Sequence, residues 1–408
     1  MSTSRDPIVI IGAGAAGLLA AIHAAGRQRE VILLERTPDG GRKILISGGG
    51  RCNVLPAALD TGRFVTASSA NSMRKILRGW PHDAMRRFFE EEAGLPLRVE
   101  EATGKLFPVA DRSRAVRDAL HALALARGVR FRGTTEVVGL TPTTDGWSIA
   151  IPDGEPISAA AVVLATGGLS VPQTGSDGFG FRALAALGHT IQPTYPALTP
   201  LTLDPPAFAE LAGVSLPVTI RARSPVEQRD ATGGFLFTHR GYSGPALLDV
   251  SHVAVRGRLA REPRAELTVA WGAHDARSWE GWLAPSPAHV ATVVRQRLPT
   301  RLADRLLREA DVAADTQLAQ LPRTARRRLL QVLTAFPLPW TSDEGYKKAE
   351  VTGGGVALEE IDPVTMESRI HPGLFLAGEL LDAFGPIGGY NFTWAWVTGR
   401  LAGLGAVR

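Results

Sequence analysis

The sequence predicts an α/β protein in which a parallel sheet is interrupted by an inserted β lobe and a small helical lobe. Three observations support this fold class. The chain opens with "PIVIIGAG", "AAGLLAAIHAAG" and "EVILLER", which read in order as strand, helix and strand. The residue pattern changes near Pro193, where prolines and alternating apolar residues begin, and again near Ser286, where helical spacing begins. From Gly373 it returns to strand, glycine loop and helix, so we expect both ends of the chain to share one domain.

The length and these changes in the residue pattern suggest the domain boundaries. At 408 residues the chain exceeds what one hydrophobic core usually organises. We predict a discontinuous main domain over 1–192 and 345–408, a β lobe over 193–275 and a helical lobe over 276–344.

The composition is that of an ordinary soluble globular protein, with 45% hydrophobic and 21% charged residues and a mean hydropathy of +0.03. One cysteine excludes an internal disulfide framework and fits a reducing compartment. A net charge of +5 and a pI near 9.7 mildly favour anionic partners such as phosphates or RNA.

The segment Pro7–Gly26 is almost uncharged and about as long as a membrane span. Its β-branched start and its glycines instead favour a buried strand, turn and helix, and no signal-peptide pattern precedes it. We therefore expect a cytoplasmic protein without a membrane partner.

The α/β pattern continues to about residue 190, with a helix around "SRAVRDALHALALARG" and short strands in "VRFRGTTEVVGLT", "WSIAI" and "AAVVLATGG". Prolines and alternating apolar residues after Pro193 predict short strands. Helical spacing follows from Ser286 to Phe336, with Ser286 as a candidate N-cap and Pro287 at the first helical position.

The stretch "GAGAAG" predicts a dinucleotide site. Gly12 permits a tight turn, Gly14 lets the backbone approach a pyrophosphate, and Gly17 allows close helix packing. Glu35 ends the second strand, where a carboxylate can accept hydrogen bonds from a ribose. The alternative is a tight strand-to-helix turn with no ligand.

A second glycine motif, Gly178–Ala183, follows "VPQTGSD" rather than a hydrophobic strand, so only one nucleotide fold is visible. This favours tightly bound, non-covalent FAD over a dedicated NAD(P)H module, with NAD(P)H as a candidate transient electron donor. "VVLATGG" and "LFLAGE" support FAD because each is an apolar strand that ends in small residues. The alternative is that both stretches are ordinary strand ends of an α/β sheet that bind no cofactor.

Several longer stretches carry a family resemblance: "IGAGAAG", "GRKILISGGGRCN", "GKLFPVADR", "ATGGLSVPQTGSDG", "LFTHRGYSGPALLDVS", "AEVTGGGVALEEIDPVTMESR" and "GLFLAGELLDAFGPIGGYNFTWAWVTG". Together they resemble the BaiN/YhiN-type flavoproteins, which include aminoacetone oxidases, bile-acid ene-reductases and a ribosomal-RNA dihydrouridine synthase. The resemblance implies a glutathione-reductase-like FAD-binding Rossmann domain with an inserted β-barrel-like lobe and a small helical lobe.

The resemblance also implies roles for individual residues. Gly12, Gly14, Gly17 and Glu35 would hold the ADP half of FAD; Lys43, Ser47, Arg51, Cys52 and Asn53 would lie along the flavin; and Glu379, Gly389, Tyr390 and Asn391 would close over its pyrimidine end. The other expected cofactor contacts are Ala15, Arg42, Gly50, Val138, Ala165, Thr166, Gly167, Gly378 and Gly388. The sequence departs from the family at "VLP" after "GGGRCN" and at "DAFG", so the substrate is not transferred.

The stretch "GPIGGYNFTWAW" places backbone donors at the start of a helix, where they would stabilise negative charge on flavin N1 and O2. An acidic side chain inserted at Gly389 is then expected to lower the flavin potential.

The candidate proton donors or bases are Cys52, Tyr390, His239 and Tyr242. Arg51 and a helix terminus would lower the pKa of Cys52. The alternatives are a small apolar spacer at Cys52, a hydrogen-bonded structural histidine at 239 and packing roles for the tyrosines.

No sequence pattern suggests a metal site. Arg323, Arg326, Arg327 and Arg328 share a helix, which is either a solvated face or an RNA contact.

Three functions fit this sequence. The leading hypothesis is an FAD-dependent oxidoreductase that reduces an activated C=C bond, by hydride from flavin N5 and a proton from a loop residue. The second is an amine or amino-ketone oxidase that uses oxygen. The third is an RNA-associated or protein-binding flavoprotein, which either reduces uracil in RNA or holds FAD chiefly as a structural group. The expected partner is a small-molecule substrate or an RNA base.

Overall fold

The computed structural model describes residues 6–26, 29–152, 154–272 and 274–408. The chain forms two compact units, one made of Met1–Thr194 with Val351–Arg408 and the other of Tyr195–Glu350. Strand β11 (Ile191–Ala197) leads from the first unit to the second, and β19 (Val351–Val356) follows the return; the two strands pair with each other.

A five-stranded parallel sheet forms the centre of the first unit, in the order β20-β10-β1-β2-β6. Its strands are β1 (Ile8–Ile11), β2 (Val31–Leu34), β6 (Arg130–Arg132), β10 (Ala161–Leu164) and β20 (Leu374–Leu376). All four residues of β1 are buried, which explains their unbroken apolar pattern in a sheet covered on both faces. The segment Pro7–Gly26 is therefore a strand and a helix, as predicted, and no helix within the described ranges is long and apolar enough to cross a membrane.

Two three-stranded antiparallel sheets accompany the parallel sheet. The first contains β3 (Leu55–Pro56), β5 (Lys105–Pro108) and β4 (Leu97–Glu100), and the second contains β7 (Gly139–Thr143), β8 (Gly146–Ala150) and β9 (Ile157–Ala159). The helices of this unit are α1 (Ala15–Ala24), α2 (Arg42–Ile46), α3 (Ala70–Arg78), α4 (His82–Arg87), α5 (Ser113–Ala126), α6 (Phe179–Ala186) and α12 (Tyr390–Gly405).

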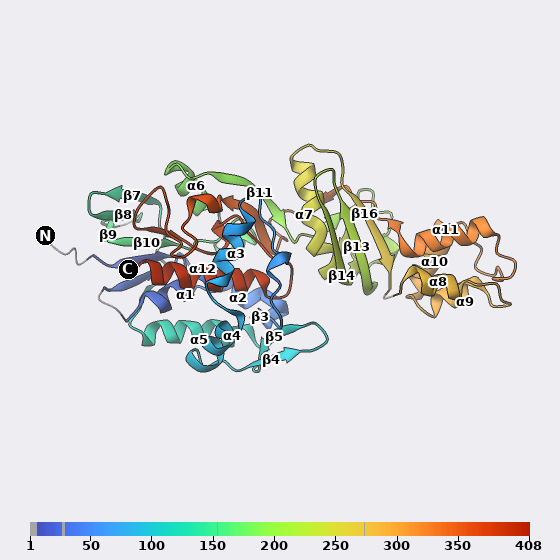
Figure 1. Ribbon diagram of the computed structural model, residues 1–408, viewed down its shortest axis with the longest axis horizontal. Helices are drawn as coiled ribbons and strands as arrows, with labels where there is room; N and C mark the ends of the chain where they lie inside the picture. Colours follow the sequence, from blue (N-terminus) through green and yellow to red (C-terminus); the bar gives the residue numbers. More distant parts are fainter. Residues whose placement is uncertain (1–5, 27–28, 153, 273) are drawn as a thin grey trace. The chain divides into compact units, whose positions relative to one another are not determined.

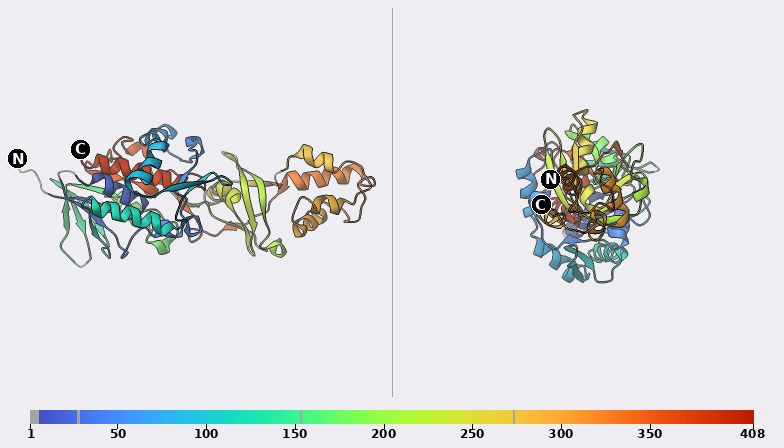
Figure 2. Two further views of the ribbon diagram at one scale, coloured as in Figure 1. Left: turned by 90° about the horizontal axis from the view of Figure 1, so that it is seen from below. Right: turned by 90° about the vertical axis from the view of Figure 1, so that its right-hand side faces the viewer.

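Helix α12, at the end of the chain, packs directly on α1, at its beginning. Figure 1 draws α12 in red beside α1 in blue, and the left view of Figure 2 keeps the two together. A Cβ on Gly399 would lie 2.2 Å from the carbonyl oxygen of Ala16, and one on Gly403 would lie 2.3 Å from that of Ala20. Only glycine permits such close approach of two helix backbones, so these positions fix how closely α12 packs on α1.

The second unit contains a seven-stranded antiparallel sheet in the order β17-β16-β13-β14-β15-β12-β18. Its strands are β12 (Leu201–Thr202), β13 (Ser215–Arg223), β14 (Gln228–Phe237), β15 (Gly241–Ser243), β16 (Glu266–Trp271), β17 (Phe336–Pro337) and β18 (Ser342–Asp343). Its helices are α7 (Pro245–Leu259), α8 (Ala276–Trp282), α9 (Val290–Arg295), α10 (Thr300–Glu309) and α11 (Arg323–Thr334).

Burial alternates along β13, which indicates a sheet with one covered face, and α7 packs on β13 and β14. Strands β17 and β18 come from the segment predicted as the helical lobe and join this sheet instead. Phe336 accounts for β17, because its ring packs on Trp271 and Phe208 inside the lobe.

The predicted start of the helix at Ser286 and Pro287 is wrong. Helix α9 begins at Val290, with His289 at its N-cap. The carbonyl oxygen of Ser286 accepts a hydrogen bond of 2.8 Å from the amide of Ala319, and His289 pairs with Gln317. These contacts are incompatible with a helix that starts at Ser286.

The α1–α12 contact predicts a large effect of one methyl group. Gly399→Ala should lower the free energy of unfolding by about 3 kcal/mol, because the added carbon overlaps the Ala16 carbonyl. The matched control is Gly281→Ala in α8, where a Cβ meets nothing within 4 Å; it should leave stability unchanged or raise it by about 0.5–1 kcal/mol. Urea unfolding followed by far-UV circular dichroism measures both, and wild-type stability for Gly399→Ala would show that α12 is not fixed by this contact.

Candidate cofactor and active site

The turn after β1 combines two tightly packed glycines with one open glycine. Gly12 has a φ of +100°, and a Cβ there would lie 2.6 Å from the carbonyl oxygen of Ala165. A Cβ on Gly17 would lie 1.8 Å from the carbonyl oxygen of Gly12. A Cβ on Gly14, by contrast, would meet nothing within 4 Å. The backbone at Gly14 and at Ala15, the first residue of α1, is therefore the accessible part of the turn.

Glu35 is buried and organises this turn. One carboxylate oxygen accepts a hydrogen bond of 2.8 Å from the amide of Ala13, and the other accepts from the amide and hydroxyl of Thr37 at 2.8 and 2.7 Å. Its expected contact with a ribose remains a prediction.

The ends of β10 and β20 lie beside the same turn. The amide of Ala165 donates to Ile11, and Gly167 has a positive φ of 73°. The hydroxyl oxygen of Thr166 is buried and has no hydrogen-bond partner among the residues described. An orphaned hydroxyl at a strand end is a candidate ligand contact, because a buried polar group without a partner is costly.

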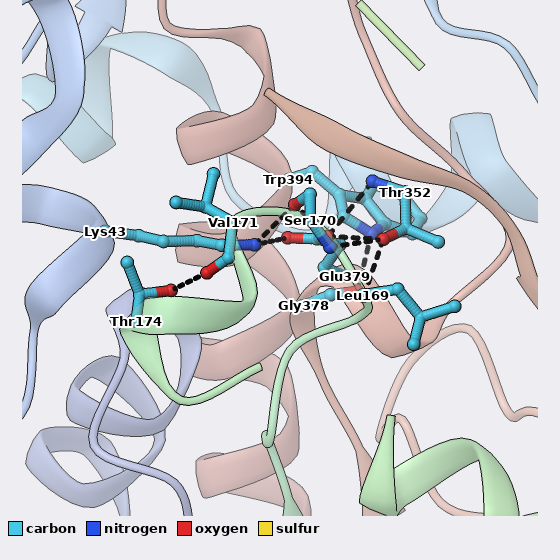
Figure 3. A network of polar contacts seen from close by, with 9 residues as sticks. All are labelled: Lys43, Leu169, Ser170, Val171, Thr174, Thr352, Gly378, Glu379 and Trp394. Atoms are coloured by element: carbon cyan, nitrogen blue, oxygen red, sulfur yellow. Dashed lines mark hydrogen bonds and ion pairs between the residues drawn. The ribbon is translucent and has the colours of Figure 1, made fainter. Parts of the chain in front are cut away.

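A polar network around Glu379 joins four distant segments of the first unit (Figure 3). The Lys43 ammonium lies 2.6 Å from one Glu379 carboxylate oxygen and donates to the Ser170 hydroxyl at 2.6 Å. The second carboxylate oxygen accepts from the Ser170 hydroxyl at 2.7 Å and from the Thr352 amide and hydroxyl at 3.0 and 2.7 Å. Next to it, Trp394 of α12 donates to the Gly378 carbonyl at 3.1 Å.

This network keeps Glu379 ionised. Burial alone would raise the pKa of its carboxyl, but the charge of Lys43 and the hydrogen bonds from Lys43, Ser170 and Thr352 outweigh burial and lower it. Lys43 and Glu379 therefore form a charged pair at the expected flavin-binding side of the sheet.

The triple glycine after α2 presents bare backbone. Gly48, Gly49 and Gly50 all have positive φ, and a Cβ on Gly49 or Gly50 would meet nothing within 4 Å. Arg42 and Ser47 flank this stretch: Arg42 pairs with Asp39 at 3.7 Å, and the Ser47 hydroxyl donates to Ile44 at 2.8 Å. The exposed glycines can lie against a flat ligand, as predicted for the flavin.

The lowered pKa predicted for Cys52 is wrong. The thiol is fully buried, and burial raises its pKa to about 12 against a weaker opposing effect of the Ser47 hydroxyl. Arg51 does not act on it, because its guanidinium pairs with Glu100 at 2.9 Å and lies 4.1 Å from the centre of the Phe107 ring. Cys52 is a neutral thiol at physiological pH.

The start of α12 is built from two glycines with positive φ, Gly388 and Gly389. The buried Tyr390 ring packs on Phe64 with 5.6 Å between centroids, and its hydroxyl accepts from Arg63 at 3.5 Å. As at any helix start, the first amides have no acceptor within the helix and can bind an anion.

One expectation at this helix start needs correction, and one stays a prediction. The Asn391 side chain accepts from the Gly385 amide and donates to the Gly385 carbonyl, both at 2.9 Å, so it holds the preceding loop, and its contact with the flavin stays a prediction. A side chain at Gly389 would place its Cβ 2.6 Å from the backbone of Leu55. An acidic substitution there would therefore distort the loop and could not report on flavin potential.

The remaining predicted residues are His239 and Tyr242 of the second unit and Val138 of the first. His239 is exposed, whereas Tyr242 is fully buried among aromatic rings of the second unit and burial raises its pKa. The Tyr242 hydroxyl has no partner within the described part of the chain. The Val138 side chain is exposed, and its amide donates to Ala150 next to the β7-β8-β9 sheet.

Sequence reasoning missed Ser170 and Thr352, the two hydroxyl residues that hold Glu379. Both lie inside stretches that carry the family resemblance, "ATGGLSVPQTGSDG" and "AEVTGGGVALEEIDPVTMESR", which was the available signal. Among the described residues, no group of three histidine, cysteine or acidic side chains could hold a metal ion.

The features of the first unit define a class of protein. A parallel sheet with a glycine turn at β1, an open backbone position at Gly14, an orphaned Thr166 hydroxyl and bare glycine backbone at Gly49 together fit an extended dinucleotide with a flat ring. Such a site is typical of FAD-binding Rossmann domains of the glutathione-reductase type.

The chain belongs to the HI0933-like family, whose model, described as "HI0933-like protein Rossmann domain", matches residues 6–405. It is an FAD-dependent oxidoreductase with an FAD-binding Rossmann fold.

Full-length relatives and a solved structure agree with this assignment. The chain is 33% identical over 402 residues to a "Ribosomal RNA dihydrouridine synthase" of Escherichia coli K12, covering 96% of each protein. It is 31% identical over 407 residues to a "3-dehydro-bile acid delta(4,6)-reductase" of Clostridium scindens, covering 98% of each. The structure of 3-ketosteroid-delta4-(5alpha)-dehydrogenase from Rhodococcus jostii RHA1 matches with a TM-score of 0.53 at 16% identity, over 100% of this chain and 98% of that one, which shows a shared fold.

The Glu379 network predicts a specific loss of stability. Glu379→Gln removes the counter-ion of the partly buried Lys43 and should lower the free energy of unfolding by about 2–3 kcal/mol. Because the folded pKa of Glu379 lies below its ordinary value of 4.5, wild-type stability from this group is complete above that value and falls as the pH drops through the folded pKa. Urea unfolding across this pH range should show that this contribution is absent from the variant.

The matched control is Glu101→Gln, an exposed carboxylate in a turn of the same unit, which should unfold like the wild type at every pH. If Glu379→Gln also unfolded like the wild type, the stabilising role assigned to the Lys43–Glu379 ion pair would be contradicted.

The state of Cys52 predicts its reactivity. The native protein should not react with a thiol reagent such as DTNB at about pH 8, because the thiol is buried and neutral. Protein unfolded in guanidinium chloride should release one equivalent of chromophore, since the chain holds a single cysteine. Rapid labelling of the folded protein would restore Cys52 as a chemical candidate.

Proposed function

We propose that this protein reduces an activated C=C bond, with FAD bound non-covalently and NAD(P)H as the electron donor. The observation that supports it is the pair of full-length relatives at 33% and 31% identity, one named a dihydrouridine synthase and the other a delta(4,6)-reductase. Dihydrouridine is uridine reduced at its C5=C6 bond, and delta(4,6) denotes two ring double bonds. Both names therefore describe hydrogenation of a C=C bond conjugated to a carbonyl.

The residues of the first unit would bind the cofactor. The turn at Gly12, Gly14 and Gly17 would hold the pyrophosphate at the start of α1, and the Thr166 hydroxyl would gain a partner. Gly48–Gly50 would lie along the flavin, and the start of α12 would support negative charge on its pyrimidine end. Bound FAD would supply a hydride from its N5 to the substrate.

Tyr390 is the best of the four candidates for the proton that completes the reduction. It stands at the start of α12, in the same unit as the glycine turn, and its hydroxyl accepts a hydrogen bond from Arg63. The pKa of about 12 makes Cys52 a poor acid, Tyr242 is fully buried among aromatic rings, and His239 is exposed to solvent. The Arg63 cation would stabilise the phenolate left when Tyr390 gives up its proton.

The substrate class is proposed from the relatives alone. A carbonyl-conjugated small molecule and a uracil in ribosomal RNA both present the same reducible bond. The arginine run on α11 gives limited support to RNA, because Arg326 donates to Leu318 and Arg328 donates to Ala310 and Asp311. Arg323 and Arg327 are the exposed members that make no such contact with the described residues. Either substrate is consistent with the cytoplasmic location that we propose.

Anaerobic stopped-flow absorbance tests the proposal. NADH or NADPH should bleach the flavin, and either a delta-4,6 unsaturated 3-ketosteroid or a uridine-containing ribosomal RNA fragment should restore its colour with formation of the reduced product. Air alone should restore it slowly. Bleaching by an amine with rapid peroxide formation would instead identify an oxidase, and a flavin inert to all donors would contradict any reductase.

Two variants separate the proposed acid from a buried tyrosine in the same assay. Tyr390→Phe keeps the packing on Phe64 and should slow reoxidation by the unsaturated substrate about 100-fold or more while NAD(P)H still bleaches the flavin. Tyr242→Phe should leave both steps unchanged, because its hydroxyl has no partner within the described chain.

A further inference from the structure

Lys105, the first residue of β5, carries a charge that the protein does not neutralise. Glu100 lies directly across from it on β4, but that carboxylate bonds to Arg51 at 2.9 Å and to the Thr103 hydroxyl at 2.6 Å. No other carboxylate in the described ranges forms an ion pair with Lys105. Its ammonium group is thus available to another anion.

The position of Lys105 beside α12 makes this charge informative. A Cβ built on Gly388 would lie 3.3 Å from Cε of Lys105 and 3.8 Å from its Cγ, so the lysine stem runs along the loop that starts the helix. The Arg63 guanidinium is 5.1 Å from the centre of the ring of Tyr390, the first residue of α12. Two cationic side chains therefore lie at the start of α12, and the helix N-terminus itself carries partial positive charge.

Such an arrangement is electrostatically unfavourable in the protein alone. A lysine without a counter-ion at the positive end of a helix weakens rather than supports that helix. The same arrangement becomes favourable when a negative charge is placed between Lys105 and the helix. The start of α12 is therefore built for an anion, and Lys105 is a part of it that no packing or ion-pair role explains.

We propose that Lys105 stabilises the negative charge of reduced flavin and so raises the reduction potential of the bound cofactor. The inference rests on the proposed function in one respect, that the pyrimidine end of FAD lies at the start of α12. NAD(P)H delivers two electrons and one proton to N5 as a hydride and leaves as NAD(P)⁺; one negative charge remains over N1 and O2. Lys105 acts through its charge and exchanges no proton.

The test replaces the charge and keeps the stem. Lys105→Met should make reduction of bound FAD about tenfold less favourable, equal to about 30 mV for a two-electron couple, because a nearby opposite charge stabilises an ionised group by at least this factor. The pKa of N1 in the reduced flavin should rise by about one unit for the same reason. Both quantities are read from absorbance spectra at saturating FAD, the first by equilibration with a reference dye.

Two further variants make the result specific. Lys105→Arg should keep the wild-type potential, since the cation remains. Lys75→Met removes an exposed lysine of α3 in the same unit and should leave both readouts unchanged.

A Lys105→Met protein with wild-type potential and wild-type N1 pKa would overturn the inference. The reductase proposal would survive that result, because reoxidation by an unsaturated substrate is measured independently. Failure of every unsaturated substrate, with a shifted potential in Lys105→Met, would overturn the reductase proposal and leave the role of Lys105 supported.

Discussion

The close backbone contact between α1 and α12 is the constraint on which the rest of the site depends. It joins the first helix of the chain to the last, and it exists because Gly399 and Gly403 carry no side chain where they meet Ala16 and Ala20. The start of α1 then supplies the glycine turn, and the start of α12 supplies Gly389 and Tyr390. Two helix N-termini, each suited to negative charge, are thereby fixed on one domain, as suits FAD, whose charge lies on its central pyrophosphate and, after reduction, on the flavin.

Charge is arranged differently at three places along this domain. Near the glycine turn, the Glu35 carboxylate accepts hydrogen bonds from the backbone amides of Ala13 and Thr37. At the strand ends, Lys43 and Glu379 neutralise each other within a network of hydroxyls and an amide. At the start of α12, Lys105 has no such partner among the described residues, and the helix N-terminus adds to its positive charge. The Lys105 charge thus lies without a counter-ion where the proposed reduction would create negative charge, whereas Lys43 is neutralised by Glu379.

Much of the first unit could be predicted from the sequence, because short sequence motifs determine its local structure. The turn at Gly12, Gly14 and Gly17 follows from spacing after a β-branched strand, and the return of the tail follows from its resemblance to the start. Contacts between distant segments could not be predicted this way: Lys43 and Glu379 are 336 residues apart. Cys52 was misjudged because adjacency to Arg51 in the chain says nothing of where the guanidinium points. The start of α9 was misjudged because a neighbouring loop binds the expected first turn.

The central claim is that FAD extends from the Gly14 backbone to the start of α12, with its flavin along Gly48–Gly50. A crystal structure of the protein with bound FAD tests it most directly. The account predicts pyrophosphate oxygens at the amides that open α1, and the flavin pyrimidine beside Gly389 and within reach of the Lys105 ammonium. A flavin whose pyrimidine end points away from α12, or a pyrophosphate bound elsewhere, would contradict it.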